Sequence, residues 1–285
     1  FLGKIGQQSL WLALDRWMRD REALNPNMPV WRKVSFAILK RVGEGTLIAN
    51  VFVLAYYASI SGWVLNYLAK NTLTLFFPDS FSVTTLEIVQ ESFWTQLFFT
   101  LLHLGICYFY VNRGIRRGLE RMAYIVAPIF IILLCILCFQ SLSLTNAQES
   151  LRYLFYPDFT KITFSALNQA IGHMVLSLGL GLGTMITFGS YFQPKRDITS
   201  TGPKVVMFSI LISVVSVLIV CPMVLGATYA VFGPKLLFQT IPQLILKFQD
   251  GQLILTSFYL SLYLSSLVVS TGLLESLVTN LSDRW

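Results

Sequence analysis

Charged residues are scarce in this sequence. Asp, Glu, Lys and Arg together make up 12% of its 285 residues, whereas apolar residues make up 55%. A soluble domain of this length needs a charged shell, usually about a quarter of its residues, and this chain cannot supply one. The mean hydropathy of +0.65 agrees with that conclusion. We therefore expect an all-α polytopic membrane protein.

Side chains that could carry catalytic or metal chemistry are equally few. The sequence has two histidines and four cysteines, and all four cysteines fall inside apolar runs: Cys107, Cys135, Cys138 and Cys221. This placement argues against a disulfide framework and against a zinc site. The sequence also contains no nucleophile–base pair, metal-ligand cluster or phosphate-binding loop. We expect no enzyme activity and no cofactor of that kind.

Long apolar runs are what the sequence does have. Six stretches reach the roughly 20 residues that cross a bilayer: 46–69, 92–111, 122–145, 166–194, 205–232 and 252–281. They predict a single transmembrane domain over residues 1–285, with no signal peptide before them. Residues 1–43 would form a cytoplasmic segment. Its face of Leu10, Leu14 and Trp17 suits a helix lying on the membrane surface, although a simple connector is the alternative.

The basic residues predict the orientation of these spans. Of the 21 Lys and Arg residues, 16 fall on the side that holds both chain ends and the loops 112–121 and 195–204. The positive-inside rule therefore places both ends in the cytoplasm, with the spans in the plasma (inner) membrane. The net charge of +7 is therefore read through the loops that carry the basic residues. No nucleic-acid partner is expected.

The stretch 166–194 is too long for one straight crossing, and its middle is rich in glycine. Gly179, Gly181 and Gly183 each cost a helix about 1 kcal/mol relative to alanine. Backbone groups freed inside a membrane must be satisfied by protein, water or a ligand. Close packing through small residues is the alternative, but alternate residues do not share one helix face. We predict that residues within 177–183 leave helical geometry and that the break forms a binding site.

Several short motifs follow one another in a characteristic order along the chain. They are Leu2-Gly3-Lys4, Tyr56-Tyr57 with Trp63, Gly114-Ile-Arg-Arg-Gly-Leu-Glu-Arg121, Tyr156-Pro-Asp-Phe159, Leu274-Glu275 and Leu281-Ser-Asp283, together with the segment 172–191, which starts with Gly172-His173 and ends with Thr187-Phe-Gly-Ser-Tyr191. In this order the motifs resemble the neurotransmitter:sodium symporter family, and the segment 172–191 is similar to the sixth helix of that family. The resemblance runs from the end of the second helix through the eighth. It implies part of a five-plus-five inverted-repeat transporter fold with a broken sixth helix.

The resemblance also implies a substrate site. It assigns Tyr57 to the tyrosine whose hydroxyl binds the substrate carboxylate, although an ordinary packing tyrosine is the alternative. The other positions it assigns to the pocket are Val53, Leu176, Gly179, Leu182, Val269 and Gly272. Leu176, Leu182 and Gly179 are apolar or smaller than the residues usual in the family. A roomy apolar pocket suits a hydrophobic amino acid better than a charged one.

Sodium is the coupling ion that the resemblance implies. Ser177 matches a hydroxyl of the first sodium site, and Ser209 stands where that site usually has an asparagine. Ser213 matches the serine of chloride-dependent members, so chloride binding is also open. At the second sodium site the usual hydroxyls align with Val268 and Val269, which cannot bind a cation. We expect that site to be lost or moved.

Five further residues have a functional interpretation, a structural one, or both. His173 could carry a proton or be a packed core residue, and Glu275 is expected to pair near the cytoplasmic end of its helix. His103 is expected to serve packing. Tyr191 and Asp283 match the cytoplasmic gate of the family, with an interfacial tyrosine and a solvated aspartate as the alternative.

These observations predict sodium-coupled import of a hydrophobic amino acid. The altered ion positions favour an alternative, a degenerate or regulatory homologue with changed or lost coupling. The expected partners are the amino-acid substrate, sodium and the lipid bilayer. A homodimer is compatible with the resemblance.

Overall fold

A computed structural model describes residues 18–20, 29–77, 92–144, 146–156, 159–177, 179–191, 198–225, 233–248 and 250–283. Every regular element in these ranges is helical. The Leu2-Gly3-Lys4 motif, most of the expected membrane-surface helix, and residues 157–158, 192–194 and 226–232 lie outside the described residues. The prediction of an all-α chain is confirmed.

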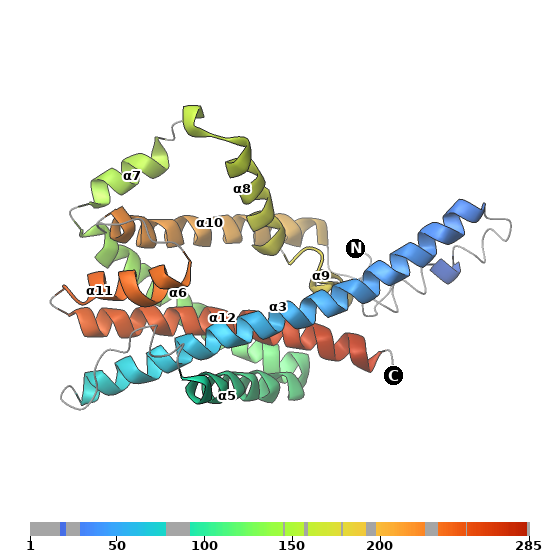
Figure 1. Ribbon diagram of the computed structural model, residues 1–285, viewed down its shortest axis with the longest axis horizontal. Helices are drawn as coiled ribbons and strands as arrows, with labels where there is room; N and C mark the ends of the chain where they lie inside the picture. The colour runs from blue at the N-terminus through green and yellow to red at the C-terminus, as the bar shows by residue number, and fades with distance from the viewer. Residues whose placement is uncertain are drawn as a thin grey trace. The chain divides into compact units, whose positions relative to one another are not determined.

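The helices in chain order are shown in Figure 1. The long ones are α3 (Val30–Phe76), α5 (Phe93–Asn112), α6 (Arg121–Leu142), α10 (Ile198–Leu225) and α12 (Gly251–Ser282). The shorter ones are α7 (Ala147–Phe155), α8 (Phe164–Ser177), α9 (Thr184–Ser190) and α11 (Ile241–Ile245). Two π-helical turns, η1 (Ile115–Glu120) and η3 (Leu236–Thr240), and one 3-10 turn, η2 (Phe159–Lys161), complete the described elements.

Five helices in the described part of the chain are long and apolar enough to cross a membrane. They cover residues 41–76, 93–112, 115–142, 200–224 and 251–282. The stretch 166–194, which we expected to be too long for one crossing, is divided between α8 and α9 and is not among them. Together with the apolar composition, these helices make the chain an integral membrane protein.

The first long helix extends well beyond the expected span of residues 46–69. α3 runs without interruption for 47 residues, from Val30 to Phe76. The sequence explains both ends, because Pro29 directly precedes the helix and Pro78 follows two residues after it, with no proline between them. Proline is tolerated at a helix start but disfavours helical geometry in the residue before it. The expectation that a span begins at residue 46 therefore missed a longer helix.

The chain forms two compact units. The first consists of residues 1–56, 160–202 and 270–285, and the second of residues 57–159 and 203–269. The core of the second unit is built around three aromatic rings. Tyr67 stacks on Tyr259 with ring centroids 5.3 Å apart, and Phe238 lies 5.0 Å from Tyr67. Ile241, Ile245 and Leu255 are buried against them.

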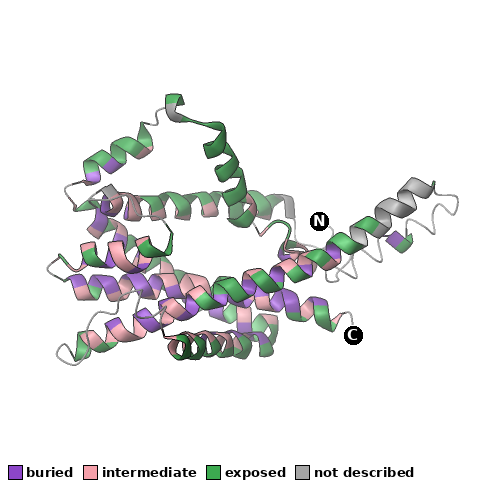
Figure 2. Cartoon of the chain, viewed as in Figure 1, coloured by how far each residue is buried: buried purple, intermediate pink, exposed green. Residues whose placement is uncertain are grey.

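Many large apolar side chains outside these cores are exposed. Figure 2 shows that α8 has no buried residue along its length, and that the exposed positions extend over much of α5, α6 and α10. Exposed apolar surface on this scale is unusual for a soluble protein. In a membrane protein the lipid tails supply the missing apolar contacts, so the exposure agrees with the composition.

Candidate functional site

The break between α8 and α9 is the most unusual backbone feature of the first unit. α8 ends at Ser177 and α9 begins at Thr184. In between, Gly179, Gly181 and Gly183 have φ values of 62°, 85° and 73°. These left-handed values cost other residue types free energy but cost glycine little. The prediction that the chain leaves helical geometry within residues 177–183 is confirmed, since α8 ends at Ser177 and the positive φ values begin at Gly179.

A Schellman motif ends α8. The Leu180 backbone N–H donates to the Val175 carbonyl at 3.0 Å, and the Gly179 N–H donates to the Leu176 carbonyl at 3.0 Å. This bonding pattern, with a left-handed glycine, is the usual way to satisfy the last carbonyls of a helix. The Thr184 hydroxyl adds a bond to the Gly179 carbonyl at 3.3 Å. The break is therefore a defined turn with its own hydrogen bonds.

A buried polar cluster joins α9 to the end of α12 within the first unit. The Asn280 amide donates to Thr187 Oγ1 at 3.0 Å and to the Ser276 carbonyl at 2.7 Å. The Ser276 hydroxyl lies 3.4 Å from Thr187 Oγ1, and Thr187 in turn donates to the Gly183 carbonyl at 3.3 Å. All three side chains are fully buried. The cluster ties the second half of the broken helix to α12.

Tyr191 forms a second contact between the same two elements. Its hydroxyl donates to Glu275 Oε1 at 3.0 Å and lies 2.6 Å from Thr279 Oγ1. The Thr279 hydroxyl also lies 3.4 Å from Glu275 Oε1. Glu275 is buried, so these hydroxyls supply polar contacts that water would otherwise give its carboxylate. Asp283, one turn beyond Thr279, is half-buried.

Two of the expected substrate residues meet in an apolar cluster. Val53 and Leu182 both pack against the buried side chains of Leu54, Leu273 and Leu277. A third expected residue, Gly272, lies beside the Phe188 ring, because a Cβ there would be 3.4 Å from Phe188 Cζ. The apolar character expected for this part of the chain is therefore present around the break.

Other expected residues lie outside that cluster. In the first unit Leu176 is 68% exposed, and the Ser177 hydroxyl bonds back to its own helix at the Met174 carbonyl. In the second unit Tyr57 is 39% exposed and Val269 is 42% exposed. The Ser213 hydroxyl donates to the Ser209 carbonyl at 2.9 Å. The assignments of these residues to substrate and ions stay predictions.

The two histidines differ sharply in their surroundings. His103 is fully buried, with its Nε2 atom 3.6 Å from the Cys107 sulfur and its ring 5.8 Å from the Tyr263 ring. His173 is exposed on α8. The environment of His103 is that of a packed side chain.

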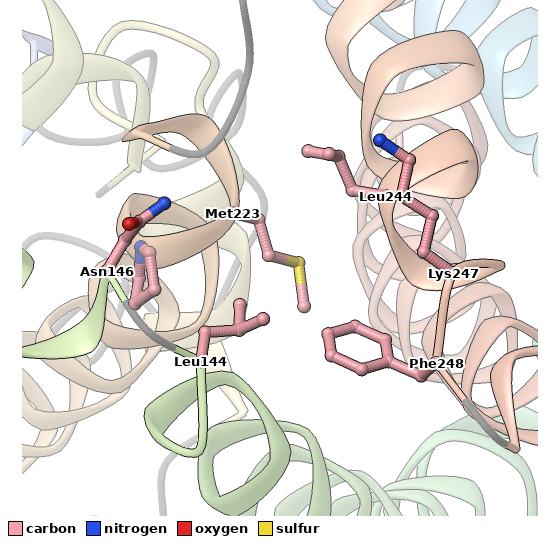
Figure 3. A pocket seen from close by; sticks show the side chains of 7 residues that line it. Leu144, Asn146, Met223, Leu244, Lys247 and Phe248 are labelled. Atoms are coloured by element: carbon pink, nitrogen blue, oxygen red, sulfur yellow. The ribbon is translucent and has the colours of Figure 1, made fainter.

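A cavity of about 230 Å³ lies in the second unit (Figure 3). Leu144, Met223 and Phe248 converge on its centre, while Asn146 and Lys247 lie on opposite walls. None of the expected substrate or ion residues lines it. It is therefore a separate feature from the site predicted around the broken helix.

Comparison with known proteins identifies the family. Residues 80–285 match the profile described as the sodium:neurotransmitter symporter family. The chain belongs to this family. Members of the family are transporters, which agrees with the scarcity of catalytic side chains in the sequence.

Individual members of the symporter family are similar over most of the chain. It is 26% identical to the uncharacterized sodium-dependent transporter YhdH of Bacillus subtilis, over 82% of this chain and 52% of that protein. An uncharacterized sodium-dependent transporter of Haemophilus influenzae is also 26% identical, over 86% of this chain and 55% of that protein. The chain thus spans about half the length of these relatives.

The fold has been seen in a solved member of the family. The crystal structure of MhsT in complex with L-phenylalanine matches all of this chain and 62% of its own, with a TM-score of 0.79 and 26% identity. This match confirms the expected fold class, including the broken sixth helix.

The residues that the resemblance assigns to the second sodium site differ in burial from the residues that follow them. Val268 and Val269 are 37% and 42% exposed, whereas the next two residues, Ser270 and Thr271, are fully buried. The Ser270 hydroxyl has no hydrogen-bond partner among the described residues, and neither does the Asn50 amide. Such groups are usually satisfied by water, an ion or another part of the protein.

The sequence alone did not predict the α12 residues that hold α9 against the end of α12. The sequence-based prediction includes Tyr191 as a gate residue and Thr187 within a motif, but it does not include Ser276, Thr279 or Asn280. A signal was available, since Glu275, Ser276, Thr279 and Asn280 repeat at the spacing of one helix face. Polar residues on one face of an apolar helix indicate a buried contact.

Proposed function

We propose that the protein is a sodium-coupled secondary transporter that imports a hydrophobic amino acid across the plasma membrane. The observation that carries the proposal is the break at residues 177–183, with three left-handed glycines in an otherwise apolar helix. Backbone groups outside a helical ladder are the kind of ligand that holds substrates and ions in transporters. Family membership makes transport the natural use of this break.

An apolar side chain is the substrate feature that the surroundings favour. Leu182 and Val53 pack on a leucine cluster beside the break, and no described Lys or Arg takes part in that cluster. The solved relative binds L-phenylalanine. The proposal takes Tyr57 as the group that binds the substrate carboxylate, and Ser177 and Ser209 as sodium ligands. Chloride binding at Ser213, a homodimer and cytoplasmic chain ends remain further expectations.

Uptake into proteoliposomes tests the proposal. We expect the full-length protein to accumulate radiolabelled phenylalanine or leucine under an inward sodium gradient, and not under a choline gradient of equal strength. An excess of unlabelled glutamate or lysine should not reduce this uptake. Uptake that is the same with and without sodium would contradict the proposed coupling.

A matched pair of tyrosine variants tests the assigned site. Tyr57→Phe removes the hydroxyl proposed to bind the substrate carboxylate, which should raise KM about tenfold for the loss of roughly 1.4 kcal/mol of binding. Tyr56→Phe, at the exposed neighbouring position, makes the same chemical change and should leave KM unchanged. Equal effects of both variants would remove Tyr57 from the site.

The exposed valines favour a second candidate function, a homologue that binds a ligand without coupled transport. Val268 and Val269 offer no oxygen where the family aligns hydroxyl ligands. Equilibrium binding of labelled phenylalanine separates the two candidates. Binding without sodium-driven accumulation would support the regulatory homologue, and binding with accumulation would support the transporter.

A further inference from the structure

The turn between α5 and α6 has a tightly constrained backbone. Gly114 has a φ of 73°, a left-handed value that turns the chain sharply after α5. The wide π-turn η1 then brings Gly118 against α5, where a Cβ would overlap the Tyr110 carbonyl oxygen. Glycine is required at such close approaches. The two glycines thus hold the end of α5 against the start of α6.

This turn gathers three arginines around one concavity. Arg113 caps α5, Arg117 lies in η1 and Arg121 is the first residue of α6. Their side chains line a hollow of about 320 Å³. The Arg113 guanidinium lies 3.9 Å above the Phe109 ring. A cation–π contact of this kind leaves guanidinium N–H groups available to an anion.

The three positive charges have no negative partner within the described residues. None of the carboxylates in the described ranges, including neighbouring Glu120, forms an ion pair with Arg113, Arg117 or Arg121. Three like charges that line one hollow repel one another. A bound anion would relieve this repulsion, so the arrangement fits an anion better than it fits an empty surface.

We propose that Arg113, Arg117 and Arg121 bind the phosphate group of an anionic phospholipid. Arginine presents a planar fork of donors that matches phosphate oxygens in a bidentate manner. The site also lies at the junction of two helices that are long and apolar enough to span the membrane, with Arg113 between them and Arg117 and Arg121 in the first turns of the second. That position places it at the depth of the lipid headgroups, where basic clusters next to spans attract anionic lipid. The inference goes beyond transport and does not depend on the substrate.

Native mass spectrometry of the full-length protein tests the site. The protein is released from micelles containing phosphatidylglycerol or, separately, phosphatidylcholine, and retained lipid is counted. The wild type should retain phosphatidylglycerol in preference to phosphatidylcholine. Arg117→Gln should weaken phosphatidylglycerol retention about tenfold, the effect of losing a charge-assisted hydrogen bond to the phosphate.

Arg116→Gln is the matched control. It removes the same charge one residue away, but Arg116 does not line the hollow, so its lipid retention should stay within about twofold of the wild type. Equal losses in Arg116→Gln and Arg117→Gln would show only a general surface attraction and overturn the site. Unchanged retention in both variants would also overturn it.

A soluble source of phosphate is tested separately. Inorganic phosphate is titrated against the protein in phosphatidylcholine micelles, and thermal unfolding of wild type and Arg117→Gln is followed. We expect phosphate to shift the unfolding temperature of neither protein, because a site at headgroup depth takes its phosphate from lipid. Stabilisation of the wild type alone, without phosphatidylglycerol retention, would overturn the assignment to lipid.

Discussion

Buried polar residues in the first unit find their partners far along the chain. Glu275 accepts a hydrogen bond from Tyr191, 84 residues away in sequence, and Asn280 donates to Thr187, 93 residues away. A buried carboxylate is costly unless it is hydrogen-bonded. The polar contacts at this end of α12 are therefore stabilising only as pairs. Removing one member should lower the free energy of unfolding, because the other is left buried without its partner.

Removing the Tyr191 hydroxyl should destabilise the protein. Tyr191→Phe takes away the 3.0 Å donor to Glu275, leaving a buried carboxylate with the Thr279 hydroxyl at 3.4 Å. Hydrogen bonds to charged groups contribute about 1.5–3 kcal/mol, so we expect a loss of that size in the free energy of unfolding. Reversible denaturation in detergent measures it.

Tyr124→Phe is the control for this prediction. Tyr124 is 83% exposed, so the same change should alter the free energy of unfolding by less than about 0.5 kcal/mol. If Glu275→Gln rescues Tyr191→Phe, the cost belongs to the stranded charge. A loss no larger than that of Tyr124→Phe would mean that the Tyr191–Glu275 contact does not stabilise the fold.

Asn280 and Thr187 should show energetic coupling. In a double-mutant cycle of Asn280→Ala and Thr187→Val, we expect an interaction free energy of about 0.5–1.5 kcal/mol, because the two side chains share a buried 3.0 Å hydrogen bond. The four unfolding free energies of the cycle measure it. Strictly additive losses would show that the cluster consists of independent contacts.

At the scale of elements, the glycine-rich break is a feature of backbone geometry. Gly179 and Gly183 border the turn from opposite ends, at the Schellman motif of α8 and at the start of α9. Gly181 lies between them with the largest φ of the three. Substitutions here act through conformation and local space, which separates them from ordinary packing changes.

Alanine substitutions at these glycines should lower the stability of the protein by different amounts. Gly181→Ala should cost about 1–2 kcal/mol from its left-handed φ alone, since a Cβ there meets open space. Gly179→Ala should cost more, because its Cβ would also approach Thr184 Oγ1 to 2.9 Å. Thermal unfolding of both variants measures the order.

Gly172→Ala provides the matched control in the same segment. Gly172 lies inside α8 with open space at its Cβ position, so alanine should stabilise the helix by up to about 1 kcal/mol. Stabilisation by Gly181→Ala of the same size as by Gly172→Ala would indicate that the helix is continuous through residue 181.

At the scale of the whole molecule, the exposed apolar surface determines the surroundings that the protein needs. Apolar side chains cover much of the exposed surface of α5, α6, α8 and α10. Only a surrounding of lipid or further protein satisfies such a surface. Function in this protein is therefore a property of the membrane-embedded, full-length chain, and sodium dependence has to be measured there.

The ion stoichiometry of uptake should be low. With valines at the two aligned ligand positions, we expect a sodium Hill coefficient close to one for uptake by the full-length protein. Val268→Thr with Val269→Ser restores the hydroxyls and should raise the coefficient and the sodium affinity. Leu253→Ser, an exposed position on the same helix, should change neither. A wild-type coefficient clearly above one would contradict this prediction.

The sequence predicted the features that depend on local chemistry. The shortage of charge indicated a membrane protein, and the glycines at 179, 181 and 183 indicated a broken helix, because backbone preference acts within a few residues. The ends of α3 were equally local, at Pro29 and Pro78, yet the expected span of residues 46–69 followed hydropathy and missed them. Hydropathy reports what can lie in lipid, whereas proline reports where a helix must end.

Tertiary structure alone decided which side chains meet. The partners of Glu275 and Thr187 come from elements separated by more than 80 residues, and periodicity along one helix cannot name the facing residue on another. The same holds for α12, where Val268 and Val269 are exposed while Ser270 and Thr271 are buried. Sequence determines which groups are available and where the backbone bends, but burial and pairing depend on the packing of distant segments.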